Sequence, residues 1–322
     1  MRVLSDDDVA TVLDLDSLLP VVEQAFRKQG RDEVERPERP HFPVGAGLEG
    51  DEPLGTGLTM PAYIHGAEYY ATKLASVHEG NADRGLPTVQ AQIALTDART
   101  GEPAAMLAGT RVTNARTGCI GGLSADHLAA GDGPVRVGVI GAGTQARWQV
   151  RAIAAARGVE EVRIYSPSES REACAADLRA EGFDATAVDS ARTAVTDAAV
   201  VVTATTATVP VFPGEALSAG TLVVAVGAYT AEMREIDVET VDRAAQLFGD
   251  VPEEVAETGD FPEHEASAVT PLSAVFDGEA ERASASDIIV VASVGSAVLD
   301  AAAASALFER ALEADVGNET AL

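Results

Sequence analysis

Hydrophobic and polar positions follow one pattern in the first third of the chain and another from residue 135 onward. At the start, residues 5–29 carry apolar side chains at helical spacing, with Ser5 or an early aspartate available as a cap. This spacing predicts one amphipathic helix whose apolar stripe is formed by Val9, Val12, Leu13, Leu19, Val22 and Phe26. Residues 36–62 are rich in glycine and proline without a clear period, so we expect a loop or irregular strand there.

Strand-like patterns follow the glycine- and proline-rich segment. Residues 69–77 and 88–96 are predicted strands, and the second alternates apolar and polar positions as a half-buried strand does. A turn leads to a further short strand at 104–109, and a helix is predicted over 112–130. Strands and helices thus occur together without regular alternation in this part, which indicates an α+β domain.

From Val135 the chain alternates short β-rich runs with helical segments, which favours a parallel sheet covered on both faces. We therefore predict an α/β protein in which residues 126–298 form a Rossmann-type domain with a parallel sheet. Residues 1–125 together with 299–322 are expected to form a separate α+β domain. The last predicted helix, 296–313, would return the chain to that first domain.

The composition narrows the classes of function. The chain has 322 residues and a formal net charge of −28 without a basic run, which argues against a nucleic-acid partner. No apolar stretch reaches the length of a membrane-spanning helix, and the first residues are acidic where a signal peptide would be apolar, so we expect a cytoplasmic protein without a membrane partner.

The excess of acids over lysines favours a halophilic, salt-adapted surface, with an ordinary acidic cytosolic protein as the alternative. Cys119 and Cys174 are scattered, and neither they nor the histidines show metal-ligand spacing, so no metal is expected.

A glycine-rich turn at 141–146 carries the clearest chemical signal. It follows the predicted strand 135–140 and precedes a helix, in the order Gly141-x-Gly143-x-x-Ala146. Gly141 permits a tight turn, Gly143 allows the backbone to approach a pyrophosphate, and Ala146 allows close helix packing. The pattern predicts a bound dinucleotide, whereas a turn without nucleotide is the alternative.

The end of the next predicted strand bears on which dinucleotide binds. An acid there would hold the ribose hydroxyls of NAD, but this chain has Ser166, followed by Ser168, Ser170 and Arg171. Hydroxyls with an arginine suit the 2′-phosphate of NADP, while the nearby Glu169 argues the other way. NADP is the predicted cofactor, with NAD as the alternative.

Candidate substrate groups occur in the first domain. Arg36, Arg39 and Arg116 could bind a carboxylate with the two-pronged guanidinium, although an isolated arginine is often a solvated surface residue. Arg116 lies on a largely apolar predicted helix, which favours a buried role. Lys73 is one of two lysines in the chain, the other being Lys28.

Over nearly its whole length the chain resembles the ornithine cyclodeaminase/mu-crystallin family, which also includes an archaeal type of alanine dehydrogenase and ketimine reductases. The resemblance depends on many short motifs that occur in order. They are Arg39 after "RPE", "MPA" at 60–62, Lys73, "EGN" and "GLP" within 79–87, "LTDARTGEPAAMLAG" at 95–109, "TNARTG" at 113–118, "IGAGTQA" at 140–146, "TATTATVPVF" at 203–212, "VGAYTAEMREID" at 226–237 and "SVGSAVLDAAAA" at 293–304.

The resemblance implies a role for each matching position. Arg39 and Arg116 would hold the substrate carboxylate, and Lys73 would touch the carboxylate or the reacting carbon–nitrogen centre. The first domain would form a homodimer through its sheet. The cofactor residues implied are Gly141, Gly143, Thr144, Gln145 and Ala146 at the pyrophosphate, and Thr205, Ser293, Val294 and Gly295 at the nicotinamide side.

One position departs from the family pattern. Ornithine-cyclising members have an aspartate just after the "VGA" turn, where this chain has Tyr229. A phenol is a poor base at neutral pH, which argues against ornithine cyclisation and leaves hydride exchange untouched. Tyr229 would then border the substrate or only fill the pocket mouth.

The predicted activity is that of an NAD(P)-dependent imine reductase or amino-acid dehydrogenase. It would act on the C–N or C=N bond of a small amino or imino acid. The imino acid would be either free, formed from pyruvate and ammonia, or cyclic. Lys73 is the predicted catalytic residue because an ammonium with a depressed pKa can release its proton, whereas a guanidinium cannot. A lysine that acts only as a fixed charge is the alternative role. Ornithine cyclodeaminase and a non-catalytic, crystallin-like NADP-binding protein are the alternative functions.

Overall fold

The computed structural model describes residues 1–261 and 264–321, and the chain divides into two compact units. The first unit comprises residues 1–116 and 297–322, and the second comprises residues 117–296. One limit falls inside helix α3 (Gly109–Leu128), so this helix contributes its first residues to one unit and the rest to the other. The other limit falls at the start of helix α10 (Ala297–Glu313).

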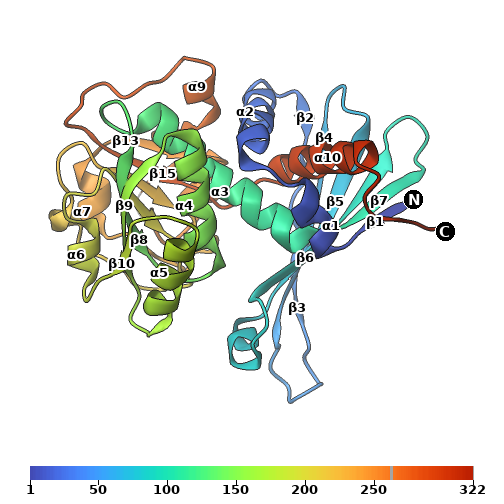
Figure 1. Ribbon diagram of the computed structural model, residues 1–322, viewed down its shortest axis with the longest axis horizontal. Coiled ribbons are helices and arrows are strands. Elements are labelled where there is room, and N and C mark those ends of the chain that lie inside the picture. Colours follow the sequence, from blue (N-terminus) through green and yellow to red (C-terminus); the bar gives the residue numbers. More distant parts are fainter. Residues whose placement is uncertain (262–263, 322) are drawn as a thin grey trace. The chain divides into compact units, whose positions relative to one another are not determined.

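The first unit is an α+β structure built around a mixed sheet. Besides α3 and α10, its elements are β1 (Arg2–Leu4), α1 (Asp6–Val12), α2 (Leu15–Gly30), β2 (Val34–Glu35), β3 (His41–Val44), β4 (Gly55–Ile64), β5 (Tyr69–Val77), the 3-10 helix η1 (Glu79–Arg84), β6 (Val89–Asp97), β7 (Pro103–Ala108) and β16 (Asn318–Glu319). The strand order is β16-β1-β7-β6-β5-β4-β2, with β3 also paired to β4. Helix α10 packs against α2 and against β4 and β5, as Figure 1 shows.

Side-chain alternation gives this sheet two different faces. The register places Lys73 of β5 beside Ile93 of β6, which is beside Leu107 of β7, and all three are buried on the inner face toward α10. Thr72, Ala94 and Met106 form the adjacent row on the opposite face, because successive residues of a strand point to opposite sides. We call this opposite side the outer face.

One prediction for the first unit is wrong, and a second holds only in part. Residues 5–29 form α1 and α2 instead of one helix, because the chain is extended at Leu13 and Asp14 caps a new helix by accepting the backbone N–H of Ser17 at 3.0 Å. The segment 36–62, expected as loop or irregular strand, contains the β3–β4 hairpin and the ten-residue β4. Pairing with β5 along the length of β4 stabilises a strand that its composition alone did not indicate.

The second unit contains the predicted parallel sheet. Its elements are β8 (Val135–Ile140), α4 (Thr144–Ala156), β9 (Val159–Tyr165), α5 (Ser170–Ala180), β10 (Ala185–Ala187), α6 (Ala191–Val195), β11 (Val200–Thr203), η2 (Gly214–Ala216), β12 (Leu222–Ala225), α7 (Val238–Arg243), β13 (Ala244–Gly249), α8 (Pro252–Ala256), η3 (Ala266–Ala268), β14 (Thr270–Pro271), α9 (Ser273–Phe276) and β15 (Ile288–Ala292). Every residue of β11, β12 and β15 is buried, as expected for strands covered on both faces.

The strand order of this sheet is β10-β9-β8-β11-β12-β15-β13-β14, and its strands run parallel. From β8 the chain proceeds outward through β9 to β10 and then returns to the other side of β8 at β11. Such a reversal is the topological switch point at which doubly wound sheets bind ligands, beyond the carboxyl ends of the strands. The α/β class and Rossmann-type sheet predicted from the sequence are confirmed. Within the described residues, no helix combines the length and apolar character needed to cross a lipid bilayer.

Candidate active site

A buried carboxylate joins the two most buried cations of the first unit. The Lys73 ammonium donates to Asp300 Oδ2 at 2.5 Å, and Arg116 Nε donates to Asp300 Oδ1 at 3.0 Å. Lys73 is 2 % exposed, Arg116 4 % and Asp300 1 %. Thr113 adds a longer contact from its hydroxyl to Asp300 Oδ1 at 3.4 Å. The Lys73–Asp300–Arg116 cluster therefore carries one net positive charge inside the protein.

Three elements bring this cluster together. Lys73 comes from the inner face of the central strand β5, Arg116 from α3, which directly follows β7, and Asp300 from the first turn of α10. Because α10 packs on the inner face of β5, its acid meets the lysine although 227 positions separate them in the sequence.

Burial and neighbouring charge act on the titration of Lys73. Burial lowers its pKa to about 8; Arg116 and Arg39 add to that effect, while Asp300 opposes it. Burial would raise the pKa of Asp300, but Arg116 and Lys73 outweigh it and hold the pKa below its ordinary value. The cluster therefore contains an ammonium that can give up a proton near neutral pH and a carboxylate that stays ionised.

The structure places Arg39 near the same group. Arg39 is half-buried in the segment between β2 and β3, and its positive charge is felt at Lys73. The three residues that the resemblance assigns to the substrate, Arg39, Lys73 and Arg116, thus gather in the first unit. Tyr229 lies in the second unit, half-buried in the segment after β12.

Sequence reasoning missed Asp300. The sequence does contain a signal for this residue, because Asp300 is the single charged residue in the mostly apolar run "SAVLDAAAASALF". A charge on the buried stripe of a helix needs a partner of opposite sign, since burying it alone is costly.

The glycine-rich turn of the second unit has the geometry that a dinucleotide needs. Gly141 has φ +107°, and a Cβ there would lie 2.5 Å from the carbonyl oxygen of Ala204. Gly143 is the N-cap residue of α4 and provides no side-chain cap. A Cβ added to it would meet nothing within 4 Å, which leaves room for a phosphate beside the first backbone N–H groups of α4. The residues present therefore fit a dinucleotide pyrophosphate.

Side chains around this turn support its shape. Arg147 donates to the carbonyls of Ala142 at 2.8 Å and Gly143 at 3.0 Å. Ala146 is buried, whereas Thr144 is exposed and Gln145 half-buried at the start of α4. The Arg147 guanidinium thus holds two carbonyls of the turn.

Three serines after β9 have their hydroxyl oxygens close to one another. Ser168 and Ser170 lie 2.6 Å apart, and each lies 3.4 Å from Ser166. Arg171 donates to the Ser166 carbonyl at 2.9 Å and lies 3.9 Å from the fully exposed Asp189. The predicted hydroxyl-and-arginine set is therefore assembled, with the guanidinium already bonded to the backbone.

Two carboxylates that the sequence analysis did not single out hold the segments assigned to the nicotinamide side. Asp250 accepts the Ser293 hydroxyl at 2.7 Å and the N–H groups of Val294 at 3.1 Å and Gly295 at 2.8 Å. Glu235 accepts both the N–H and the hydroxyl of Thr205. Among the described residues, no group of three or more histidine, cysteine or acidic side chains is placed to hold a metal ion.

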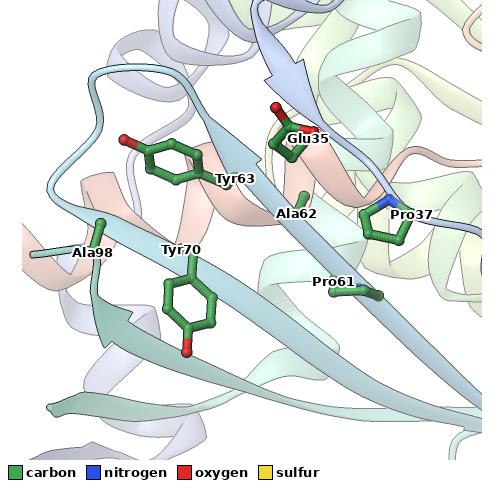
Figure 2. A pocket seen from close by; sticks show the side chains of 7 residues that line it. All are labelled: Glu35, Pro37, Pro61, Ala62, Tyr63, Tyr70 and Ala98. Atoms are coloured by element: carbon green, nitrogen blue, oxygen red, sulfur yellow. The ribbon is translucent and has the colours of Figure 1, made fainter. Parts of the chain in front are cut away.

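A hollow of about 320 Å³ lies away from the cluster, on the outer face of the first unit. Figure 2 shows the seven residues that line it, among them Pro61, Tyr63 and Tyr70. Tyr70 and Lys73 are three positions apart on β5, so their side chains point to opposite faces of the sheet. The hollow is therefore separate from the lysine cluster.

Comparison with known proteins places the chain among relatives. A model of the ornithine cyclodeaminase/mu-crystallin family matches residues 1–315. The chain belongs to this family. A Δ1-pyrroline-2-carboxylate/Δ1-piperideine-2-carboxylate reductase of Azospirillum brasilense is 37 % identical over 308 residues, which cover 92 % of this chain and 91 % of that protein.

Solved structures of the family agree with the fold. Δ1-Pyrroline-2-carboxylate reductase of Thermococcus litoralis, in complex with NADH and L-proline, is 31 % identical with a TM-score of 0.93, covering 99 % of this chain and 100 % of that one. An archaeal alanine dehydrogenase dimer with bound NAD is 27 % identical with a TM-score of 0.90, covering 100 % and 99 % of the two chains. The family membership predicted from the motifs is confirmed.

The cluster geometry predicts a large effect on stability for Asp300→Asn. The variant leaves two buried cations without their shared anion, so the free energy of unfolding should fall by about 3–5 kcal/mol. Urea denaturation of the purified protein measures it. Asp6→Asn is the matched control, because it removes the partly exposed Asp6–Arg111 pair and should cost less than about 1 kcal/mol. Equal losses in both variants would contradict a structural role for the buried charge pairing.

Proposed function

We propose that this protein is an NAD(P)-dependent oxidoreductase that reduces the C=N bond of a small 2-imino acid and, in reverse, oxidises the corresponding amino acid. A cyclic imino acid such as Δ1-pyrroline-2-carboxylate is the first candidate substrate, since the reductase relatives are named for it. The free imino acid formed from pyruvate and ammonia is the second, by analogy with the alanine dehydrogenase. The observation that carries the proposal is the buried Lys73–Asp300–Arg116 cluster.

The cluster and Arg39 suit an anionic substrate. With Arg39 included, the group has two net positive charges, which favour a bound carboxylate over a neutral ligand. Arg116 bonds Asp300 through Nε, and its two terminal nitrogens form the fork proposed for the substrate carboxylate. Arg39 would supply the second fork.

Lys73 is the proposed proton donor. Reduction of the C=N bond adds a hydride to carbon and a proton to nitrogen, and a bound nicotinamide supplies the hydride. The Lys73 ammonium would donate the proton to the imine nitrogen and recover one from water. Asp300 would keep the ammonium in place and prevent burial from lowering its pKa further.

The residues proposed to hold the cofactor belong to the second unit. Gly141, Gly143, Thr144, Gln145 and Ala146 form the turn proposed for the pyrophosphate. Thr205 and the segment Ser293, Val294 and Gly295 follow strands β11 and β15 at the same carboxyl edge and are proposed to line the nicotinamide side. Tyr229 follows β12 at this edge, where it is proposed to border the substrate in place of the cyclodeaminase aspartate.

Activity assays test the function and the role of Lys73. Oxidation of NADH or NADPH should be seen with Δ1-pyrroline-2-carboxylate, and ornithine with catalytic NAD should give no proline or ammonia. Lys73→Arg should lower kcat by about 100-fold or more, because a guanidinium cannot release its proton. Reductive activity should decline as pH rises through about 8, where the ammonium is lost, while the oxidative direction should gain over the same range.

Lys28→Arg is the matched control for that series, because it changes the other lysine, which is paired with Glu33 on the surface. It should retain full turnover. A Lys73→Arg enzyme with normal kcat would rule out proton transfer by this residue. Because the acid-rich composition predicts salt adaptation, we would run the assays in molar KCl as well as in low salt.

NADP is the proposed preferred cofactor. Two observations support this preference. No acid stands at the end of β9, and the hydroxyls of Ser166, Ser168 and Ser170 lie close together beside Arg171. The solved relatives with bound NADH and NAD make NAD the competing choice.

Ser166→Asp should reverse that preference. A carboxylate at this position repels a 2′-phosphate and accepts the ribose hydroxyls, so the NADPH/NADH ratio of kcat/KM should fall on the order of tenfold or more. Thr193→Asp adds the same charge on the exposed part of α6 and should leave the ratio unchanged. A wild-type enzyme that already prefers NADH would refute the proposed preference.

A homodimer formed through the outer face is the proposed assembly. Tyr70 is 39 % and Leu74 43 % exposed there, beside the hollow lined by Pro61 and Tyr63. Exposed apolar groups that gather on one sheet face favour association. The archaeal alanine dehydrogenase of the same fold is described as a dimer.

Leu74→Glu should shift the protein from dimer to monomer, because it places a charge in the centre of the proposed contact. Sedimentation velocity measures the change in mass. Val238→Glu on α7 is the control, since Val238 is 49 % exposed but belongs to the second unit. A Leu74→Glu protein that sediments like the wild-type dimer would exclude the outer face as the contact.

A further inference from the structure

Glu235 is a fully buried carboxylate to which the proposed mechanism gives no role. It lies between β12 and α7, and each of its oxygens accepts two hydrogen bonds. Oε1 accepts the N–H of Thr205 at 2.7 Å and its hydroxyl at 2.8 Å. Oε2 accepts the hydroxyl of Thr203 at 2.9 Å and the N–H of Gly227 at 2.7 Å.

These donors lie at the carboxyl ends of two neighbouring parallel strands. Thr203 is the last residue of β11, Thr205 follows it, and Gly227 follows β12. One side chain therefore ties the two strand ends together. The packing is close, since a Cβ on Gly227 would lie 2.2 Å from the carbonyl oxygen of Thr205 and 2.5 Å from Glu235 Oε1.

The same strand end touches the phosphate-binding turn. Strand β11 is the neighbour of β8 at the topological switch point. A Cβ on Gly141 would lie 2.5 Å from the Ala204 carbonyl oxygen and 3.2 Å from Thr205 Cγ2. A shift of Thr205 would therefore disturb both the turn and the segment proposed for the nicotinamide.

The position of Glu235 is itself fixed through its backbone. Asp260 Oδ1 accepts the N–H of Glu235 at 2.6 Å and of Ile236 at 3.0 Å, and the Glu235 carbonyl accepts the Val211 N–H at 2.9 Å. The carboxylate thus extends from an anchored backbone toward the two strand ends.

We infer that Glu235, in its ionised form, is a positioning residue that holds Thr205 and Gly227 in the conformation that binds the nicotinamide dinucleotide. The inference rests on the proposed cofactor site. An ionised carboxylate accepts all four hydrogen bonds. A protonated one offers one acceptor position fewer, because its O–H can only be donated to a threonine hydroxyl that then stops donating to Glu235. Losing that acceptor loosens the strand ends and weakens dinucleotide binding.

The surroundings make this residue sensitive to pH. Burial, together with the charge of Asp260, raises the pKa of Glu235 to about 7, against the hydrogen bonds from Thr205, Gly227 and Thr203. Arg234 is the neighbouring cation and acts on Asp260. Dinucleotide affinity should therefore fall as the pH drops through about 7.

The effect on stability has the opposite sign. Because folding raises the pKa of this acid, its contribution to the stability of the free protein is present below its unfolded pKa of 4.5 and is lost as the pH rises toward about 7. If Glu235 were needed only for folding, the affinity for the dinucleotide would not improve over the pH range in which the contribution of Glu235 to stability declines. The two trends together distinguish positioning from general destabilisation.

Fluorescence titration with NADH, in the absence of substrate, tests the inference. NADH is chosen because it has no 2′-phosphate that titrates near neutral pH. The wild type should bind about tenfold more tightly at pH 8 than at pH 6, following the ionised fraction of Glu235. Glu235→Gln should bind about tenfold more weakly than the wild type at pH 8 and show no dependence over this range. Glu215→Gln changes an exposed carboxylate of the same unit and should behave like the wild type.

Wild-type affinity in Glu235→Gln, or a pH dependence that persists in it, would overturn the inference. If this variant does not fold, a wild-type affinity for NADH that does not change between pH 6 and pH 8 would also overturn the inference. If the wild type binds only NADPH, the comparison of variants is made with NADPH, where the phosphate titration is common to both. A wild-type protein that binds neither NADH nor NADPH would refute the proposed function as well. If the wild type binds a dinucleotide and Glu235→Gln binds it with the same affinity, only this inference is refuted.

Discussion

The first unit depends on the neutralisation of buried positive charge by one carboxylate. Asp300 bonds both Lys73 and Arg116 at a place where all three side chains are buried, and without it two cations would share the interior. The cost of that arrangement is met by close hydrogen-bond geometry. What remains is a net positive group inside a chain whose formal charge is −28, a local field suited to a carboxylate-bearing substrate.

In the second unit, buried carboxylates also accept hydrogen bonds, most of them from backbone N–H groups. Glu235 and Asp250 are buried acids that accept N–H and hydroxyl groups from segments at the carboxyl ends of β11, β12 and β15. The segments proposed to bind the cofactor extend beyond the strands, and the N–H groups of Thr205, Gly227, Val294 and Gly295 bond to these carboxylates instead of strand carbonyls. Side-chain carboxylates supply the missing acceptors, and for Glu235 burial raises the pKa to about 7.

Family membership and local chemistry constrain the function in different ways. The relatives include reductases of cyclic imino acids and an alanine dehydrogenase, so the family accommodates closely related carbon–nitrogen chemistry. The buried lysine, with a pKa of about 8, is suited to proton transfer in either direction. The family resemblance implies that Tyr229 stands where ornithine-cyclising members have an acid, and this argues for simple hydride exchange over cyclisation.

The order of residues alone sufficed for the class of the fold, the parallel sheet and the glycine-rich turn, because periodicity and short motifs are local. It also singled out Lys73 and Arg116, which the structure brings together around Asp300. The break between α1 and α2 and the long strand β4 were missed, since a cap at Asp14 and pairing with β5 outweighed the apparent pattern. Asp300 was missed for a different reason. Its partner lies 227 positions away, and only the packing of α10 on β5 turns a lone acid in an alanine-rich helix into the counter-ion of the proposed active site.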